Sequence, residues 1–288
     1  MFTNGVCRIV NTSIDYSCVN KCFGYKLFFS SFLVSKNNCM NFVLPAWLIE
    51  IAHKGAKIPY VKSLFKPLYY SFKQVLEKKR NDNFHKYSLN ALKSFDKCLS
   101  DAKIPYTLIF GSLLGAVREG GFIKHDLDID VALYINDRTS LLYKILKEEG
   151  FKLIRRFVID DGMQGCEETF EYKNTGVTLD IFYICPPIDK YPYCCCWNKA
   201  EGCSTYRESV KKIGGVYPRR IDQPVKKEMR RVPFETISVS ITTNAHECLE
   251  FAYGPNYMIP DPNFIPPVQH RYVWYEKLAN VEFFEGYI

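Results

Sequence analysis

Three aspartates at alternate positions, Asp126, Asp128 and Asp130, are the residues of this 288-residue sequence best suited to chemistry. We expect the segment 126–133 to form a β-strand, in which side chains alternate between the two faces. The three carboxylates would then share one face, and the apolar residues between them would enter the core. Crowded carboxylates repel one another, and a divalent cation bound by their oxygens relieves that repulsion. The spacing therefore predicts a site for Mg²⁺ or Mn²⁺.

A further carboxylate, Asp180, stands in the middle of the otherwise apolar stretch 177–184. A carboxylate inside a buried strand is costly unless it is paired or bound to a metal. A salt bridge to an arginine explains Asp180 equally well if the residue is considered alone. Together with the aspartates upstream, metal binding by Asp128, Asp130 and Asp180 is the better interpretation.

Gly111-Ser112 precedes the acidic run and is expected to form a turn between a strand and a short helix. Backbone N–H groups at such a turn suit a phosphate. Arg118, late in the short helix, is a candidate to hold a phosphate oxygen through its guanidinium, although an ion pair with Glu119 is the plainer alternative. Lys124 is a further candidate for phosphate contact. His125 has no feature that separates it from an ordinary loop residue.

The elements that must position these residues follow from hydrophobic periodicity. Apolar residues at three- and four-residue steps predict a helix before the motif, and short apolar runs ended by turn residues predict strands. The order is typical of an α/β (α+β) fold with a mixed sheet flanked by helices. A Gly-Ser turn followed within about twenty residues by Asp-x-Asp on a strand, with a third aspartate on a later strand, indicates a sheet of the nucleotidyltransferase type. We expect helices at 83–102, 113–118 and 138–149, and strands at 106–110, 126–133, 151–158, 167–172 and 177–185.

We expect two parts in the chain. Residues 1–78 form a leader whose segment 62–73 mixes lysines with large apolar residues, which suits either a membrane-surface element or a helix packed on the main domain. Residues 79–288 form the catalytic domain. The net charge of +7 favours an anionic partner but is too dispersed to indicate nucleic acid. No run of about 18 apolar residues and no secretory signal is recognisable in the sequence.

The twelve cysteines do not form the framework of a small secreted domain, so a reduced, intracellular chain is the simpler interpretation. Several of them cluster after Asp180. A Zn²⁺ site formed by Cys185, Cys194, Cys196 and Cys203 is one hypothesis. Adjacent residues of a strand point in opposite directions, however, so a Tyr-rich insertion with free thiols is the alternative.

The stretch from Gly111 to Asp130 resembles the LicD/fukutin-related family. Members of this family carry a Gly-[Ser/Thr]-Leu-Leu-Gly-x-x-Arg element, then Gly-Phe-Ile, then an acidic Asp-x-Asp-x-Asp run. Their ending is similar to the segment 234–262 of this chain, which contains Tyr253-Gly-Pro-Asn-Tyr257. The resemblance covers about residues 84–265. Leu127 interrupts the three adjacent aspartates of many bacterial members, so the acidic run is more similar to the fukutin-like version.

The resemblance implies a metal-dependent phosphotransferase. It would move a phospho-alcohol, phosphocholine or ribitol phosphate, from a CDP-activated donor to a glycan or lipid-linked oligosaccharide, and CMP would leave. Asp128, Asp130 and Asp180 would hold the metal, and Asp180 would also be suited to accept the proton of the attacking hydroxyl. Asp126 would be an outer ligand or the base.

Three other functions compete with this one. A nucleotidyltransferase that extends nucleic acid would be expected to carry a stronger basic or aromatic strand-binding region. A glycosyltransferase also uses Asp-x-Asp with a sugar nucleotide, but it would need neither the Gly-Ser turn nor Asp180. A non-catalytic relative that binds nucleotide or glycan would not need to retain all the expected acids. For the compartment, we expect the cytoplasm, with peripheral contact to the inner membrane; the alternative is the Golgi lumen, where the fukutin-like members of animals reside.

Overall fold

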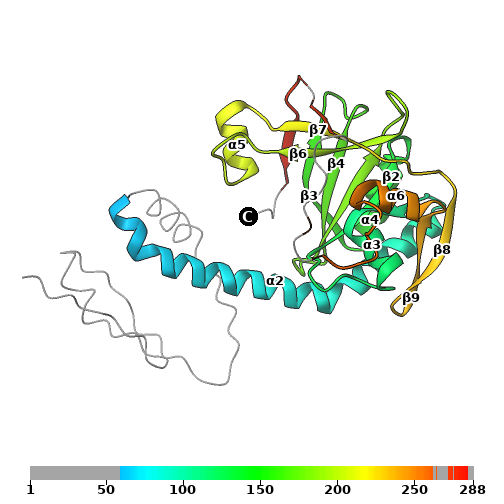
Figure 1. Cartoon of the computed structure of the whole chain (residues 1–288), viewed down its shortest axis with the longest axis horizontal. Helices are drawn as coiled ribbons and strands as arrows, with labels where there is room; N and C mark the ends of the chain where they lie inside the picture. Colours follow the sequence, from blue (N-terminus) through cyan, green and yellow to red (C-terminus); the bar gives the residue numbers. More distant parts are fainter. Residues whose placement is uncertain (1–58, 262–263, 265–271, 275, 285–288) are drawn as a thin grey trace, which may run out of the picture.

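The computed structural model describes residues 59–261, 264, 272–274 and 276–284, so residues 1–58 of the predicted leader 1–78 lie outside them. The first described element is helix α2 (Pro59–Asp101). Its C-terminal half packs on the body of the protein, while its N-terminal half extends away from it (Figure 1). The helix runs continuously across residue 79, where we placed the start of the catalytic domain, so that division stays a prediction.

The main sheet has six strands in the order β1-β2-β5-β4-β3-β11. The neighbours β2 and β5, second and third in this order, are parallel, and the other neighbouring strands are antiparallel. This arrangement confirms the predicted mixed sheet. The strands are β1 (Thr107–Leu108), β2 (Asp128–Tyr134), β3 (Phe151–Val158), β4 (Cys166–Tyr172), β5 (Thr178–Ile184) and β11 (Asn280–Phe283).

Most predicted elements are present, and one strand has the predicted bounds, 151–158. Two boundaries in the motif were wrong. The acidic strand begins at Asp128, so Asp126 lies in the loop before it. The strand expected at 106–110 has only two residues, because Phe110 already starts helix α3 (Phe110–Arg118). Gly111 and Ser112 therefore belong to the first turn of this helix.

The remaining elements surround the main sheet. The predicted helix 138–149 is α4 (Ser140–Glu148), which follows the short 3₁₀ helix η2 (Ile135–Asp137). A three-stranded sheet in the order β10-β7-β6 and a two-stranded sheet of β8 and β9 complete the strands. Their bounds, with those of the last two helices, are β6 (Tyr193–Asn198), α5 (Tyr206–Ile213), β7 (Tyr217–Asp222), β8 (Met229–Phe234), β9 (Ile237–Thr242), α6 (Ala245–Tyr253) and β10 (Tyr272–Trp274).

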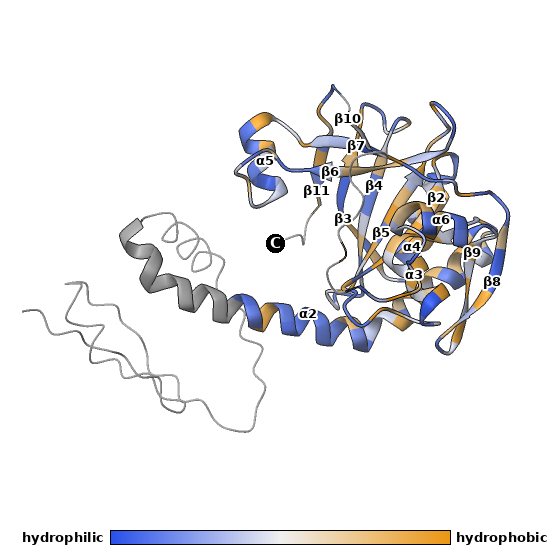
Figure 2. Ribbon diagram, viewed as in Figure 1, coloured by the Kyte–Doolittle hydropathy of each residue, from blue (hydrophilic) through white to orange (hydrophobic). Residues whose placement is uncertain are grey.

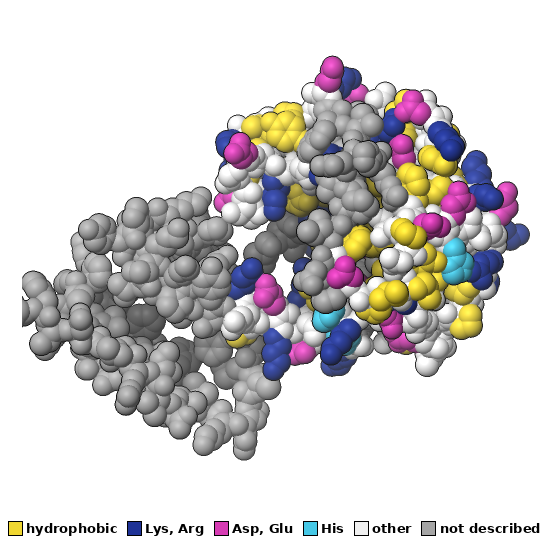
Figure 3. Space-filling model, in the orientation of Figure 1, with side chains coloured by type: hydrophobic (Ala, Val, Ile, Leu, Met, Phe, Trp, Pro, Cys, Tyr) yellow, Lys and Arg dark blue, Asp and Glu magenta, His cyan; other side chains and the backbone are white. Residues whose placement is uncertain are grey.

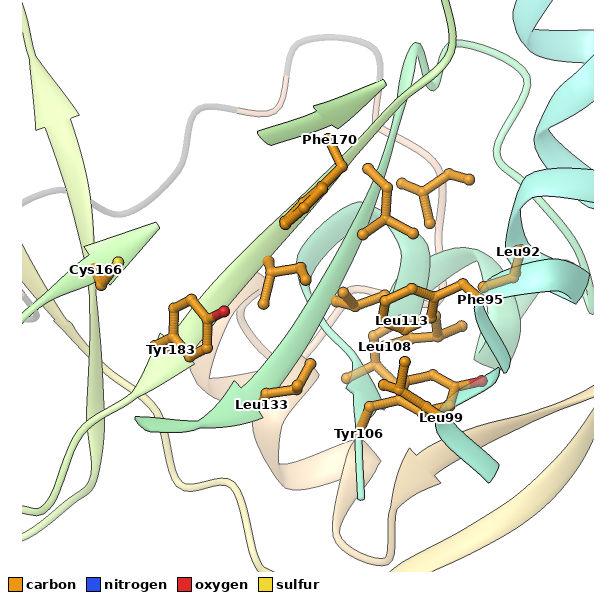
Figure 4. Packing of buried hydrophobic residues seen from close by; sticks show 14 of the residues in the cluster. Leu92, Phe95, Leu99, Tyr106, Leu108, Leu113, Leu133, Cys166, Phe170 and Tyr183 are labelled. Atoms are coloured by element: carbon orange, nitrogen blue, oxygen red, sulfur yellow. The ribbon is translucent and has the colours of Figure 1, made fainter. Parts of the chain in front are cut away.

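One face of the main sheet carries the core. Leu92, Phe95 and Leu99 of α2 recur at helical spacing and are fully buried, which is why this part of the helix stays against the sheet. Figure 4 shows them packed with Leu108 of β1 and other apolar side chains. Apolar residues gather in the sheet and its covering helices, whereas the described outer part of α2 is mostly hydrophilic (Figure 2). The core thus fixes β2 and β5 as neighbours.

Among the described residues, no helix combines the length and the apolar character needed to cross a bilayer. The segment 62–73, expected to be either a membrane-surface element or a packed helix, lies within α2. Of its side chains only that of Lys73 is described, so both alternatives stay predictions.

Candidate active site

The structure brings the predicted metal ligands to one face of neighbouring strands. Asp130 of β2 and Asp180 of β5 are direct partners in the parallel register, and Asp128 is paired with Thr178 two residues earlier. Because side chains alternate along strands, Asp128, Asp130 and Asp180 all point to the face opposite the core. Ile129 between them is fully buried in the core. The carboxylates of Asp128 and Asp130 therefore meet that of Asp180, which follows Asp130 by 50 residues in sequence, on neighbouring inner strands of the sheet.

The same face becomes apolar two residues further along both strands. Ala132 and Phe182 are buried against Cys194 and Ile221 of the second sheet. The second sheet thus covers this end of the face. The carboxylates begin where that cover stops, which leaves them a route to solvent.

Asp126 approaches the site from the preceding loop rather than from the strand. Its Oδ2 accepts a hydrogen bond from the backbone N–H of Ile123 at 3.2 Å, which holds the loop in a turn. A Cβ atom placed on Gly111 would lie 3.2 Å from Asp126 Oδ1 and 3.7 Å from Asp130 Oδ2. The first turn of α3 therefore lies directly against two of the acids, and only glycine leaves this spacing undisturbed.

The start of α3 is shaped by Phe110 and Ser112. Phe110 has a φ of 48°, in the left-handed region that a bulky residue rarely adopts, so the turn is strained beside the acids. Its ring packs edge-on against Phe182 at 5.0 Å. The buried hydroxyl of Ser112 accepts the backbone N–H of Asp130 at 2.9 Å. Ser112 therefore positions β2, and its predicted contact with substrate stays a prediction.

Burial, with electrostatic repulsion from neighbouring acids, raises the pKa values of Asp126, Asp130 and Asp180. Burial, followed by the charge of Asp128, raises the pKa of Asp126 to about 6. Burial raises the pKa of Asp180 to about 6, although Arg155 and Arg80 oppose this shift. The pKa of Asp130 is raised well above its usual value by burial and by the neighbouring acids. Bound positive charge at this face would relieve all three shifts.

Two observations bear on whether the acidic residues fit a metal ion. Among the described residues, no three His, Cys, Asp or Glu side chains are already placed so that they could hold one ion. The buried Oδ1 of Asp180 nevertheless has no hydrogen-bond partner, although buried polar atoms normally have one. Small side-chain rotations would bring the carboxylates to a cation, and a buried oxygen without a partner is costly unless a ligand reaches it. The donors are hard oxygens, which suits Mg²⁺ or Mn²⁺.

Glu167 of β4 is an acid of this face that the sequence reasoning missed. It is paired with Phe182 of β5, and Thr169, two residues later, is paired with Asp180. Burial and then the charge of Asp180 raise the pKa of Glu167 to about 8. Its Oε2 accepts the indole N–H of Trp197 at 2.7 Å. The signal that selected Asp180, a carboxylate in an otherwise apolar strand, did not mark Glu167, because Glu168 and Glu171 lie in the same strand.

The adjacent Glu168 points to the other face and is a structural residue. Its fully buried carboxylate accepts hydrogen bonds from Arg156 at 2.6 Å and from the hydroxyls of Tyr143 and Tyr183, both at 2.7 Å. Arg138 lies 3.4 Å away. Two consecutive glutamates of one strand thus serve different purposes, because strand side chains alternate.

Arg80 of helix α2 is a basic residue at the site that the sequence did not single out. Its Nη2 lies 3.5 Å from Asp128 Oδ2 and donates to the carbonyl of Leu127 at 3.3 Å. Its charge also lowers the pKa of Asp180. Helix α2 therefore contributes a cation to the acidic face from 48 residues upstream of Asp128.

The predicted phosphate ligands around the motif are placed differently from one another. Arg118 forms the ion pair with Glu119 that was the plainer alternative, at 2.8 Å, and donates to the carbonyl of Tyr257 at 3.3 Å. Its charge still acts on Asp126, whose pKa it lowers. Lys124 and His125 are exposed in the turn before the acids.

The cysteine cluster is divided between two environments. Cys194 packs in the small apolar cluster between the sheets, whereas Cys185 and Cys195 belong to the main core. The alternation expected along a strand therefore separates neighbouring thiols. Burial raises the pKa values of Cys185 and Cys196 to about 11, which favours neutral thiols over the thiolates that zinc binds. All described cysteines are free, and the predicted Zn²⁺ site with Cys203 stays a prediction.

Part of the chain that contains the motif matches a known family model. Residues 103–212 match the model of the LicD/FKTN/FKRP nucleotidyltransferase domain. This range contains α3, the acidic strand β2, and the strands that carry Glu167 and Asp180.

Curated relatives extend the similarity beyond the domain. The protein named ribitol-5-phosphate transferase FKTN of Mus musculus is 27% identical over 197 residues, which cover 66% of this chain and 38% of the relative. Its counterparts of Macaca fascicularis and Homo sapiens are 26% and 25% identical over the same length. The chain therefore matches well under half of the length of these relatives.

Proposed function

The resemblance to the LicD/fukutin-related family is confirmed by this domain match, and from it we propose that the chain is a transferase of phospho-alcohol groups. It would take ribitol phosphate or phosphocholine from a CDP-activated donor, pass it to a hydroxyl of a glycan, and release CMP. The name of the relatives favours ribitol phosphate. The compartment in which it acts stays a prediction.

One observation supports this proposal most directly: Asp130 and Asp180 are register partners at the centre of the sheet, with Asp128 on the same face. Transfer of a phosphoryl group depends mainly on positioning and on neutralising the charge of the phosphates. Burial and the charges of neighbouring acids raise the pKa values of Asp130 and Asp180. Acids in such a cluster are suited to bind a cation, and a bound cation is suited to bind a diphosphate. A purely structural role would not explain why these acids are clustered.

Asp128, Asp130 and Asp180 are the residues that would hold Mg²⁺ or Mn²⁺, which would supply positive charge to the donor diphosphate. The protein itself contributes orientation. The hydrogen bond from Asp130 N–H to Ser112 fixes β2 relative to α3. Gly111 leaves room for the carboxylates of Asp126 and Asp130.

The proton of the attacking hydroxyl needs an acceptor at this face. Asp180 is the best candidate when its Oδ1, which has no hydrogen-bond partner, is not taken by the cation. Asp126 is the alternative, because it lies at the more open edge of the cluster and keeps partial access to solvent. Only one of the two is required.

The test is release of CMP from CDP-ribitol, CDP-choline, CDP-glycerol and CDP-ethanolamine, with and without Mg²⁺, in the presence of glycan acceptor. We expect release from one donor that depends on Mg²⁺ and is lost in Asp128→Ala. Lys124→Ala serves as a test of the predicted phosphate contact in the same assay. If no donor yields CMP and a sugar nucleotide is hydrolysed instead, the glycosyltransferase hypothesis replaces this one. Binding of CDP without any turnover would indicate a non-catalytic relative.

A further inference from the structure

Arg80 forms an ion pair with Asp128 whose contribution to folding stability is too small to explain its position. The side chains of Arg80 and Asp128 are 47% and 42% exposed, and their closest atoms are 3.5 Å apart. An exposed pair of this kind contributes at most about 1 kcal/mol. Arg80 nevertheless lies between helix α2 and the acidic face, so its position is better explained by a ligand that its guanidinium could contact.

A cavity of about 320 Å³ opens beside Arg80, between helix α2 and the turn that joins β4 to β5. Most of its lining side chains are polar, and two of them are cationic. Figure 3 shows Lys and Arg side chains on the surface of α2 next to the body of the protein. The lining residues are Leu76, Lys79, Arg80, Asn83, Glu171, Asn174, Thr175 and Gly176.

The polar wall opposite the two cations is held in place by local hydrogen bonds. Asn83 donates from its amide to the carbonyl of Thr175 at 2.7 Å, which fastens α2 to the turn. Glu171, the one acidic residue among the described lining, accepts the backbone N–H of Gly176 at 3.0 Å. The Glu171 carboxylate is therefore directed to the turn. With Lys79 and Arg80, the net charge of the described lining is positive.

We propose that Arg80 is a phosphate-binding residue and that this cavity is an anion subsite beside the acidic face. Asp128 holds the guanidinium while the acids carry no cation. A divalent cation on Asp128 would repel Arg80, and the guanidinium would turn from the carboxylate to a phosphate oxygen. The planar fork of arginine matches two phosphate oxygens, which a lysine ammonium does not. The cavity indicates where the anion binds. The identity of the anion, a nucleotide diphosphate, rests on the proposed function.

The probe is inorganic pyrophosphate, titrated calorimetrically into the full chain with and without Mg²⁺. We expect Arg80→Gln to weaken pyrophosphate binding at least about tenfold, since a hydrogen bond to a charged group is lost, and Arg80→Lys to recover only part of the affinity. Lys78→Gln is the matched control, because it removes the same charge from an exposed position of the same helix that does not line the cavity. Its affinity should stay within about twofold of the wild type.

A second titration separates binding from a merely structural role. Because Arg80 competes with the cation for Asp128, Arg80→Gln should bind Mg²⁺ alone more tightly than the wild type does. Opposite changes for the two ligands support the proposal. It is overturned if Arg80→Gln binds pyrophosphate as well as the wild type, or if the wild type does not bind it. If pyrophosphate binding depends on Arg80 but no donor yields CMP, the result contradicts the proposed function and still supports the anion subsite.

Discussion

The backbone N–H of Asp130 donates to the hydroxyl of Ser112 at 2.9 Å, and this bond joins the strand of the acids to the first turn of α3. Ser112→Ala leaves the N–H without its acceptor in a buried place. We expect a loss of about 1–3 kcal/mol in the free energy of unfolding. CMP release should fall at least about tenfold, because Asp130 is no longer held.

Ser209→Ala is the control for this variant. Ser209 is also buried and accepts a backbone N–H at 2.9 Å, from Ala200 in the region of α5. It should lose similar stability in denaturant melts while the folded fraction retains its CMP release. Equal loss of activity in both variants would show that stability alone is responsible.

Gly111→Ala tests the close approach of α3 to the acids. The added Cβ would lie 3.2 Å from Asp126 Oδ1, so that carboxylate must shift. We expect reduced CMP release and a stability loss of about 1 kcal/mol, measured by denaturant unfolding. In the background Asp126→Ala the crowding atom is absent, so adding Gly111→Ala should cost measurably less. Additive effects in this double-mutant cycle would contradict the predicted contact.

The clustered acids predict an unusual dependence of stability on pH. The pKa values of Asp126 and Asp180 are raised to about 6 in the folded protein, so the folded state binds protons that the unfolded state releases. Metal-free protein should therefore become more stable as the pH falls from about 7 towards 5. Below the unfolded pKa of an aspartate the gain is complete.

Thermal melts in EDTA across this pH range measure the effect. Asp180→Asn should be more stable than the wild type at pH 7 and should depend less on pH. Mg²⁺ should stabilise the wild type most at the higher pH, because its ligands must be deprotonated. A wild-type melting temperature that falls steadily with acidification from pH 7 to 5 would be inconsistent with the raised pKa values.

The two adjacent glutamates of β4 should respond differently to the same substitution. Glu168→Gln removes the charge that faces Arg156 in the buried network, and we expect a loss of about 3–5 kcal/mol in unfolding free energy. Glu167→Gln retains an acceptor for the Trp197 N–H and relieves repulsion with Asp180, so the fold should persist. Its CMP release should fall if Glu167 helps to set the charge of the site. Chemical denaturation and the CMP assay, run on both variants, separate the two roles.

Much of the fold and the main acids could be predicted because they depend on local patterns. Alternation of aspartates with apolar residues predicted β2, and a carboxylate in an apolar strand selected Asp180. A bulky residue with a positive φ, Phe110, has no such signature, so the start of α3 was misplaced. The loop position of Asp126 has no local signature either, because it depends on a hydrogen bond from the backbone N–H of Ile123 to the Asp126 carboxylate.

The sequence by itself determined which residues are suited to chemistry, the mixed sheet, and the family resemblance, because strand alternation and motif spacing are properties of neighbouring residues. Only the tertiary structure decided how they meet. The register that pairs Asp130 with Asp180, the choice of Glu167 over Glu168 for the acidic face, and the arrival of Arg80 from helix α2 all depend on long-range packing. That packing is set by the core on the opposite face, where distant segments bury apolar area together, and no local pattern records it.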